Sequence, residues 1–222
     1  MFPGSGKAFQ KHYLWLSALL IVVLCFQNWK FRSLLRQLAG DFRQCRVQLL
    51  FQRPGAPQKG RVEPPISVVE FSNFDCTSCV EQYQNLTALS RQFPGKISWS
   101  YKHFPLVLET GNGLAVFAAM AAHLQGKFWE MRERITQEKG GISKIWIWKT
   151  AQEMGLDPEK LTEDMDPELW RPWLEGDFQD GLAEGVSEAP TLVINGHKII
   201  DGDYAFLKKF VEDLLAELGE AN

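Results

Sequence analysis

Two cysteines three positions apart are the residues of this 222-residue chain whose type and spacing indicate chemistry. Cys76 and Cys79 follow Ile66–Phe71, a β-branched and aromatic run typical of a buried strand, and open a segment, Val80–Gln92, that is predicted as helix. A cysteine in the first helical turn lies near outward-pointing N–H groups and the positive end of the helix dipole, which favours the reactive thiolate. We therefore predict a dithiol/disulfide pair in which Cys76 lies nearer the open end.

Half of a zinc site is the alternative interpretation of the same spacing. A structural zinc ion takes four ligands, and these usually include a second pair of Cys or His residues. The sequence has no second Cys-x-x-Cys motif, and His103, His123 and His197 are scattered singly. The ligand count favours a redox pair over zinc, and such a pair needs neither a metal nor an organic cofactor.

The composition is that of an ordinary globular protein, with 45% hydrophobic and 23% charged residues. The formal net charge of -3 gives no reason to expect nucleic acid as a partner. Four cysteines are too few for a disulfide-stapled scaffold, so the fold must rest on its own core. The length suits one sizeable domain with an appendage.

Residues 1–29 are predicted to form an N-terminal transmembrane signal anchor. Tyr13–Phe26 is apolar apart from Ser17, and Lys7 and Lys11 precede it. No charge appears between Lys11 and Lys30, and as a helix this uncharged stretch spans slightly less than the hydrocarbon core of roughly 30 Å. No small-x-small cleavage pattern follows it, which favours an uncleaved anchor over a cleaved signal peptide.

The charges that flank this anchor predict a topology of their own. The basic residues that follow it outnumber the two lysines before it, and the positive-inside rule then places the domain in the cytoplasm. These basic residues are Lys30, Arg32, Arg36, Arg43 and Arg46.

Residues 30–52 are predicted to form a juxtamembrane helix or stalk. Within residues 31–49, apolar residues and one cysteine alternate at steps of four and three, as in the a/d seam of a coiled coil. The seam consists of Phe31, Leu35, Leu38, Phe42, Cys45 and Leu49. A homodimer through this seam is one expectation, with Cys45 facing its own copy; an amphipathic helix lying on the membrane surface is the other.

Residues 53–65 are rich in proline and glycine and are predicted as a linker, which leaves 66–222 as the folded domain. A second strand is predicted at Ile97–His103. Thr191–Ile194 and His197–Ile200 are predicted to form a hairpin across an Asn-Gly turn.

The segment between Gly111 and Gly185 is predicted to be entirely helical, and one more helix ends the chain. Serine and aspartate residues at N-cap positions, two of them followed by proline, predict where several of these helices begin. The predicted helices are Leu114–Leu124, Phe128–Ile135, one capped by Ser143, two starting at Asp157-Pro158 and Asp166-Pro167, and Tyr204–Leu218 after Asp203.

From Ile66 to its C-terminus the chain resembles the thioredoxin superfamily, and most closely the exported DsbA-like thiol:disulfide oxidoreductases. The resemblance begins with a Val-Glu-Phe strand leading into Cys76-Thr77-Ser78-Cys79. Further motifs carry it: His103-Phe104-Pro105-Leu106, Gly126-Lys127-Phe128-Trp129-Glu130, Gly185-Val186, Ala189-Pro190-Thr191 and Val193-Ile194-Asn195-Gly196. It implies a thioredoxin-like α/β fold, a central mixed β-sheet flanked by helices, with a helical subdomain inserted at about 111–185.

The resemblance also implies roles for individual residues. Cys76 would be the nucleophile of a redox-active disulfide and Cys79 the resolving thiol. Pro190 would follow a cis peptide bond and form the wall opposite the dithiol. Glu70 matches an acidic residue that lies beneath the dithiol in this family and helps to move protons; a strand-edge charge reaching solvent is the alternative.

The implied substrate groove is lined by Thr77, Ser78, Ala189, Pro190 and Thr191, and its backbone would pair with an extended substrate segment. Thr77-Ser78 is neither the Pro-His of the strong oxidants nor the Gly-Pro of the thioredoxin reductants. Ala189 and the preceding Glu188 also depart from the family pattern. These departures leave the reduction potential, and with it the direction of electron flow, open.

The sequence therefore predicts a membrane-anchored thiol:disulfide oxidoreductase that forms disulfide bonds in exported proteins, with its domain in the periplasm or another extracytoplasmic space. Its partners would be thiol-containing protein substrates and a membrane or soluble redox protein that regenerates the active pair. A reductase or isomerase of the same fold and a non-catalytic protein-binding module are the alternatives. The location that the resemblance implies and the one that the flanking charges predict disagree.

Overall fold

The computed structural model of the chain describes residues 30, 31, 33, 34, 38, 55–61, 63–74, 76–105 and 113–220. The chain divides into two compact units, Met1–Cys45 and Arg46–Asn222. The second unit contains all the strands that the structure describes.

The first unit contributes five described residues, all helical: Lys30, Phe31, Ser33, Leu34 and Leu38. Ser33 Oγ donates a 2.8 Å hydrogen bond to the carbonyl oxygen of Lys30. The predicted anchor and most of the predicted stalk, Cys45 included, lie outside the described residues. Among the residues that are described, no helix has the length and apolar character needed to cross a membrane.

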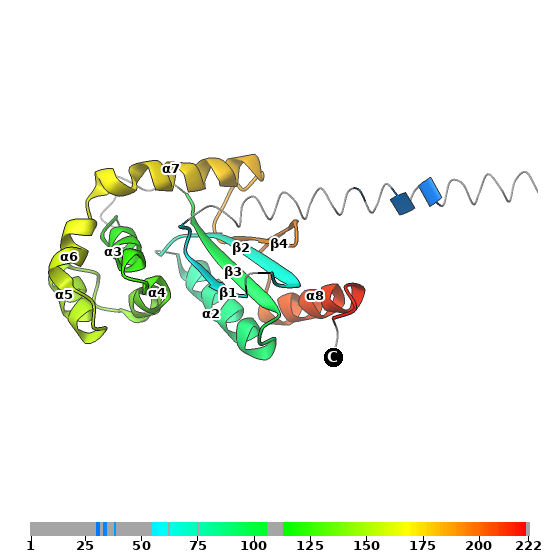
Figure 1. The fold of residues 1–222 in the computed structure, drawn as a ribbon, viewed down its shortest axis with the longest axis horizontal. Helices are drawn as coiled ribbons and strands as arrows, with labels where there is room; N and C mark the ends of the chain where they lie inside the picture. The colour runs from blue at the N-terminus through cyan, green and yellow to red at the C-terminus, as the bar shows by residue number, and fades with distance from the viewer. Residues whose placement is uncertain are drawn as a thin grey trace, which may run out of the picture. The chain divides into compact units, whose positions relative to one another are not determined.

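A five-stranded mixed sheet in the order β1-β3-β2-β4-β5 is the centre of the second unit (Figure 1). β2 (Ile66–Ser72) and β3 (Ile97–His103) are parallel, as the connection through helix α2 (Thr77–Gln92) requires. β1 (Gln58–Gly60) pairs antiparallel with β3, and β4 (Thr191–Ile194) and β5 (His197–Ile200) form the hairpin beside β2.

The register of the sheet brings the segment after β2 and the segment before β4 together at the same end of the sheet. Ser72, the last residue of β2, pairs with His103, the last residue of β3. Phe71 pairs with Thr191, the first residue of the antiparallel strand β4. The residues just after β2, which include Cys76, therefore meet the residues just before β4, which include Pro190.

Helices α2 and α8 (Tyr204–Glu217) cover one face of the sheet (Figure 1). On this face, alternate residues of the strands pack with apolar residues of both helices, as the two-residue period of a strand requires. The cluster includes Val68 of β2, Leu86 and Leu89 of α2, and Leu207 and Val211 of α8.

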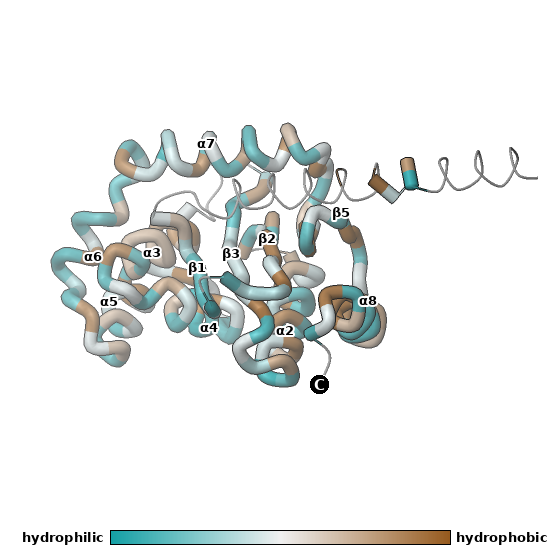
Figure 2. The backbone as a smooth tube through the Cα atoms, turned by 45° about the vertical axis from the view of Figure 1, so that its right-hand side comes forward, coloured by the Kyte–Doolittle hydropathy of each residue, from teal (hydrophilic) through white to brown (hydrophobic). Residues whose placement is uncertain are grey.

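Helix α7 (Pro167–Ala183) packs on the opposite face of the sheet. There, its partly buried Phe178 packs with Val69 and Phe71 of β2 and Val193 of β4. In Figure 2, α7 alternates between hydrophilic and hydrophobic residues along its length, as an amphipathic helix does. Gly181 of α7 packs tightly against the Phe104 and Phe71 side chains, since a Cβ there would meet the Phe104 ring at 2.7 Å and the Phe71 ring at 3.2 Å.

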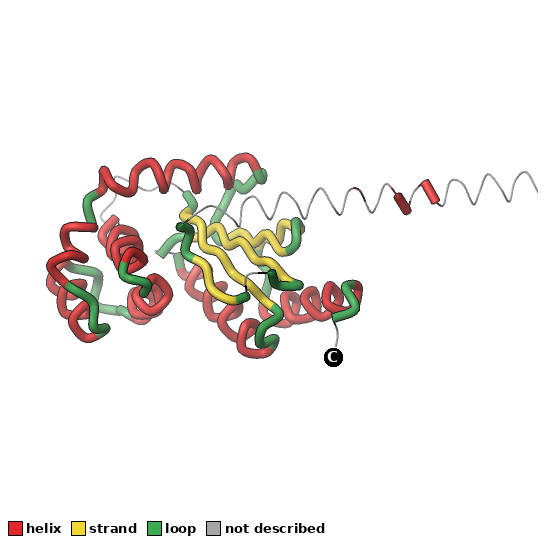
Figure 3. The backbone as a smooth tube through the Cα atoms, viewed as in Figure 1, coloured by secondary structure: helices red, strands yellow, loops and turns green. Residues whose placement is uncertain are grey.

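The segment between β3 and β4 forms a helical subdomain, shown in red beside the yellow sheet in Figure 3. Its helices are α3 (Gly113–Leu124), α4 (Phe128–Gln137), α5 (Lys144–Glu153), α6 (Pro158–Asp164) and the start of α7. Alanine-rich α3 is buried along most of its length, because small side chains let its neighbours approach closely. Ser143, Asp157 and Asp166 cap α5, α6 and α7, as predicted.

The predicted architecture is confirmed: a thioredoxin-like α/β fold with a mixed sheet and an inserted helical subdomain. The strands Ile97–His103, Thr191–Ile194 and His197–Ile200 have the predicted bounds. One correction concerns residues 53–65, which were predicted as linker: Gln58–Gly60 in this segment is the edge strand β1. Its short length and its proline- and glycine-rich flanks hide it from a pattern of alternating hydrophobicity.

Candidate active site

Cys76 and Cys79 form a disulfide at the N-terminus of α2, with their Cα atoms 5.1 Å apart. Cys76 is the N-cap residue in an extended conformation, and its Sγ accepts a 3.1 Å hydrogen bond from the backbone N–H of Cys79. Asn73 Oδ1 accepts a 3.1 Å hydrogen bond from the backbone N–H of Cys76 and so ties the loop to the helix start. The sulfur of Cys76 thus takes the place that a Ser or Asp oxygen takes in an ordinary N-cap.

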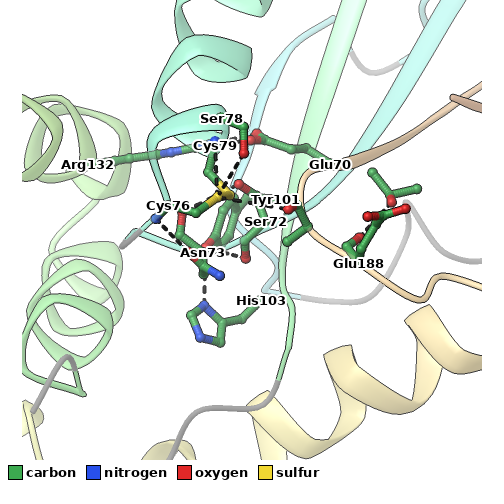
Figure 4. Close-up of a disulfide and its surroundings, with 12 residues drawn as sticks. Glu70, Ser72, Asn73, Cys76, Ser78, Cys79, Tyr101, His103, Arg132 and Glu188 are labelled. Atoms are coloured by element: carbon green, nitrogen blue, oxygen red, sulfur yellow. Dashed lines mark hydrogen bonds and ion pairs between the residues drawn. A yellow bond between two sulfur atoms is a disulfide. The ribbon is translucent and has the colours of Figure 1, made fainter. Parts of the chain in front are cut away.

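The two sulfur-bearing residues differ in exposure, because one lies before the helix and the other on its inner face. Cys76 is partly exposed, whereas Cys79 is only 1% exposed. Ser78 is exposed, and its Oγ lies 3.6 Å from Cys76 Sγ (Figure 4). No acidic residue occupies the first turn of α2, so the helix dipole acts on Cys76 without a local opposing charge from that turn.

The segment before β4 forms the facing side of the site. The Ala189–Pro190 peptide bond is cis, which confirms that prediction, and Cys76 Sγ lies 4.0 Å from the carbonyl oxygen of Ala189. Thr191 Oγ1 donates a 2.7 Å hydrogen bond to the carbonyl oxygen of Glu188 and fixes the turn into β4. Pro190 is buried, while Glu188 is exposed beside the site (Figure 4).

Glu70 is fully buried in β2 and forms an ion pair with Arg132 of α4. Arg132 Nη2 donates to Glu70 Oε1 at 2.6 Å and Nη1 donates to Oε2 at 2.8 Å. Trp99 Nε1 donates to the same Oε2 at 2.9 Å. The alternative interpretation, in which Glu70 is a strand-edge charge that reaches solvent, is therefore wrong.

Aromatic rings and one lysine surround this ion pair. The Arg132 guanidinium carbon lies 4.4 Å from the ring centroid of Tyr83 and 4.6 Å from that of Tyr101. Lys59 Nζ, from edge strand β1, lies 3.9 Å from the Trp99 centroid. Burial, together with the nearby Arg132 cation, lowers the pKa of Lys59 to about 8.

His103, the last residue of β3, lies at the same end of the sheet but is buried, and burial lowers its pKa to about 4. Tyr101 Oη donates to the carbonyl oxygen of Ser72 and lies 3.1 Å from His103 Nδ1. The imidazole is therefore neutral at physiological pH and supplies no positive charge to a thiolate.

The structure thus brings together most of the residues that the sequence predicts for the site: Cys76, Cys79, Ser78, Ala189, Pro190 and Thr191. Thr77 is exposed at the first position of α2, and Glu70 lies in the buried layer beneath. Among the described residues, no group of three or more His, Cys, Asp and Glu side chains is placed to hold a metal ion.

Arg132 is the important residue that the sequence interpretation missed, although its position carries a signal. Phe128, Met131, Arg132 and Ile135 are the buried residues of α4 and follow the spacing of one helix face. An arginine at a core position of such a face indicates a buried acidic partner, because a buried charge must be paired.

Comparisons with known proteins agree with this geometry. The family model described as Thioredoxin matches residues 53–213. Over 159 residues the chain is 28% identical to "Na(+)/H(+) antiporter NhaA 1" of Mycolicibacterium vanbaalenii, covering 68% of this chain and 25% of that protein. The chain thus spans about a quarter of the length of such curated relatives.

Solved structures with a similar fold include the thiol-disulfide exchange protein alpha-DsbA2 from Wolbachia pipientis. Its TM-score is 0.63 at 17% identity, with 80% of this chain and 98% of that chain covered. A periplasmic thioredoxin-like protein from Salmonella enterica serovar Typhimurium has a TM-score of 0.62 at 21% identity, with 78% and 97% covered. The chain belongs to the thioredoxin family, and its helical insertion gives it the DsbA-like form of that fold.

Proposed function

We propose that this protein is a thiol:disulfide oxidoreductase that exchanges its Cys76–Cys79 disulfide with thiols of exported proteins. The observation that carries the proposal is the difference in solvent exposure between Cys76 and Cys79. Cys76 is partly exposed at the start of α2 and faces the Ala189 carbonyl at 4.0 Å, whereas Cys79 is buried. An attacking thiolate therefore has access to Cys76.

The reaction would proceed through a mixed disulfide. A substrate thiolate attacks Cys76 Sγ, the Cys76–Cys79 bond breaks, and Cys79 leaves as a thiolate that is then protonated. A second substrate thiolate then attacks the substrate sulfur bonded to Cys76. The substrate disulfide forms, Cys76 leaves as a thiolate, and two electrons have passed from the substrate to the protein.

The N-terminal position of Cys76 on α2 supports the second step. The backbone N–H of Cys79 already donates to Cys76 Sγ, and Ser78 Oγ lies within reach of the same atom. These donors and the helix dipole stabilise the leaving thiolate, and a better leaving group accelerates release of the substrate.

The groove for the substrate would lie between the start of α2 and the segment before β4. Thr77 and Ser78 are exposed on one side, and Ala189 and Pro190 form the other. The backbone of residues 189–191 would pair with an extended substrate segment in the manner of an added strand. Glu188 is exposed next to this segment and adds a negative charge to the rim.

The proposed location is the periplasm or another extracytoplasmic space, with residues 1–29 as the membrane anchor. The apolar stretch at the N-terminus supports it, as does the fold shared with a periplasmic protein of Salmonella enterica. The basic residues after the stretch favour the opposite topology. Reporter fusions at the C-terminus, one active only outside the cytoplasm and one only inside it, decide between the two.

A disulfide reductase or isomerase is the second candidate. The Thr77-Ser78 dipeptide differs from that of strong oxidants, and a cytoplasmic domain would face a reducing environment. Either direction requires a redox partner that regenerates the active pair. Sodium–proton exchange, named for the relative from Mycolicibacterium vanbaalenii, is not proposed, because the chain spans only a quarter of that protein.

Trapping of substrates in cells tests the exchange reaction. The Cys79→Ala variant leaves Cys76 free to form mixed disulfides that no resolving thiol can release internally, so covalent adducts should accumulate and disappear on reduction. The matched Cys76→Ala variant, whose remaining thiol is buried, should give few adducts. Absence of adducts in both variants favours a non-catalytic binding module, for which replacing both cysteines by serine would leave partner binding unchanged.

A further inference from the structure

Helix α8 has a second line of apolar residues beside the line that packs on the sheet. Its buried residues occur at every fourth position: Leu207, Val211 and Leu215. Another apolar residue precedes each of them by one position, and residues spaced in this way form a neighbouring stripe on the helix surface. This outer stripe consists of Phe206, Phe210, Leu214 and, at the C-cap, Leu218. Phe206 is 51% exposed and Leu218 54%, so water covers much of the stripe in a single copy of the chain.

The outer stripe lies next to an open edge of the sheet. β5 is the last strand in the sheet order, so among the described residues only β4 pairs with it. The imidazole of His197 in β5 packs edge-on against the Phe210 ring, with the ring centroids 5.5 Å apart, and Phe206 stacks on Phe210 at 6.0 Å. In Figure 2, α8 and β5 lie at the side of the sheet away from β1. The strand edge and the outer stripe therefore form one continuous surface.

The edge of β5 lacks the protection that exposed strands usually have. Native proteins protect such edges with lysine side chains, prolines or bulges. Lys198 is the one lysine of β5, and its Nζ donates a 2.6 Å hydrogen bond to the carbonyl oxygen of Gly185, beyond the end of α7. Ile200, the last residue of β5, is 38% exposed. An edge of this kind favours pairing with another strand.

The charges beside the outer stripe make α8 complementary to its own copy. Lys209 lies along the solvent side of the stripe in the first half of the helix, and Asp213 and Glu217 follow it at four-residue spacing in the second half. If two such helices pack antiparallel with Phe210 against its copy, Lys209 lies within about 3 Å, along the helix axis, of Asp213 of the partner subunit. A parallel arrangement would bring like charges together instead.

We propose that α8 and β5 form a symmetric interface with a second copy of this chain, in which the two β5 strands pair antiparallel and the two outer stripes pack against each other. A two-fold axis makes such an interface self-complementary. Four side chains bury less than the roughly 800 Å² per partner of a stable interface, so the helix and strand contacts are both needed. This surface differs from the seam predicted within residues 31–49.

Such a dimer leaves both active sites open. Thr191, which follows Pro190, pairs with Ile200 at the end of β5, so this end of the strand marks the active-site end of the sheet. The two β5 strands run in opposite directions, and the two Cys76–Cys79 disulfides then lie at opposite ends of the joined sheet. Each site works by itself. The inference therefore does not depend on the proposed function, and loss of the dimer should leave exchange with glutathione unchanged.

Cross-linking of purified full-length protein in detergent tests the interface. A short amine-reactive reagent is applied to an equal mixture of chains labelled with light and heavy nitrogen, and mass spectrometry identifies links between chains. Because the two β5 strands pair across the two-fold axis, wild type should give a link from Lys198 to Lys198 of the partner subunit. Absence of this link overturns the proposal. Links that join β5 or α8 only to residues 1–52 of the other chain also overturn it and make that segment the occupant.

Phe206→Glu should reduce the Lys198 link about tenfold, because it places a charge in the centre of the contact. The substitution suits the fold, since residue 206 is the third residue of α8 after the Asp203 N-cap, a position that favours glutamate. Leu169→Glu is the matched control: Leu169 is 52% exposed and is the third residue of α7 after the Asp166 N-cap. The control should link like wild type, and equal losses in the two variants overturn the proposal.

Exchange of charges identifies the second copy as the occupant and does not depend on Phe206. Lys209→Glu alone and Asp213→Lys alone should each weaken the link about threefold, because like charges then meet across the axis. An equal mixture of the two variants, and the double variant, should restore it. Lys208→Glu is the control, since Lys208 pairs with Glu212 at 3.8 Å on the far side of the buried line, and it should have no effect. A mixture that links no better than each variant alone overturns the proposal.

Discussion

The backbone N–H of Cys79 donates a 3.1 Å hydrogen bond to Cys76 Sγ, and the side chains of the same two residues are joined by the disulfide. One cysteine thereby caps the helix that carries the other. When the disulfide is reduced, the same N–H group can donate to the Cys76 thiolate. The cap of α2 and the nucleophile are then one side chain, so helix stability and thiolate stability are linked.

The pKa of the reduced Cys76 thiol should lie below the usual value of about 8.5, because the helix dipole and the Cys79 N–H favour the thiolate. Ser78→Ala removes a hydroxyl 3.6 Å from the sulfur and should raise this pKa by about half a pH unit. Ultraviolet absorbance of the thiolate as a function of pH measures it. Ser90→Ala, at the far end of α2, is the control and should have no effect.

A Cys76 pKa at or above that of a free thiol would contradict this explanation. It would mean that the N-terminus of α2 does not stabilise the thiolate, and that Cys76 owes any reactivity to its exposure alone.

Alkylation of the reduced protein should distinguish the two cysteines. Cys76 is partly exposed and Cys79 is 1% exposed, so iodoacetamide should modify Cys76 at least about tenfold faster. Mass mapping of the labelled peptides over time gives both rates. Denatured protein is the control, in which the two rates should converge; equal rates in the native protein would refute the assignment of Cys76 as nucleophile.

Much of this fold is predictable from sequence because its signals are local. β-branched and aromatic runs, N-cap residues and the Asn195-Gly196 turn predict β2 to β5 and the helix starts. β1 is not predictable in this way, since Gln58–Gly60 becomes a strand only by pairing with Trp99 and its neighbours in β3. A short edge strand takes its conformation from its partner.

The candidate site likewise has one part that local sequence signals predict and one part that depends on long-range contacts. The placement of Cys76 and Cys79 follows from one turn of helix and needs no long-range information. The partner of Glu70 does not, because Arg132 lies 62 positions away in sequence and meets it only when the insertion packs against the sheet. The neutral state of His103 likewise depends on burial that no local pattern reveals.

Stability should fall as pH decreases from about 6.5 toward about 4, owing to His103. Burial lowers its folded-state pKa to about 4, so in this window the unfolded state binds a proton that the folded state does not. The contribution lost is at most about 3 kcal/mol. Urea unfolding at several pH values measures it; His103→Gln should flatten this dependence, whereas His197→Gln, on the partly exposed strand β5, should retain it.

Lys102 is fully buried in β3 and pairs with Asp180 at 2.7 Å and Asp177 at 3.4 Å, both on α7. Lys102→Met leaves the buried Asp177 without this cation and should lower the free energy of unfolding by about 3–5 kcal/mol. Lys160→Met, which breaks an exposed pair with Asp164, is the control and should cost far less. Equal losses in the two variants would show that Lys102 does not connect α7 to the sheet.

The reduction potential of the Cys76–Cys79 pair, titrated reversibly against glutathione, tests the central claim most directly. We predict a reversible two-electron titration with a midpoint between about -120 and -180 mV, the range of disulfide donors and isomerases, because the cap of α2 stabilises the reduced thiolate. A midpoint near -270 mV would instead assign the protein as a reductant. A pair that does not titrate reversibly at all would contradict thiol–disulfide exchange as the function of this site.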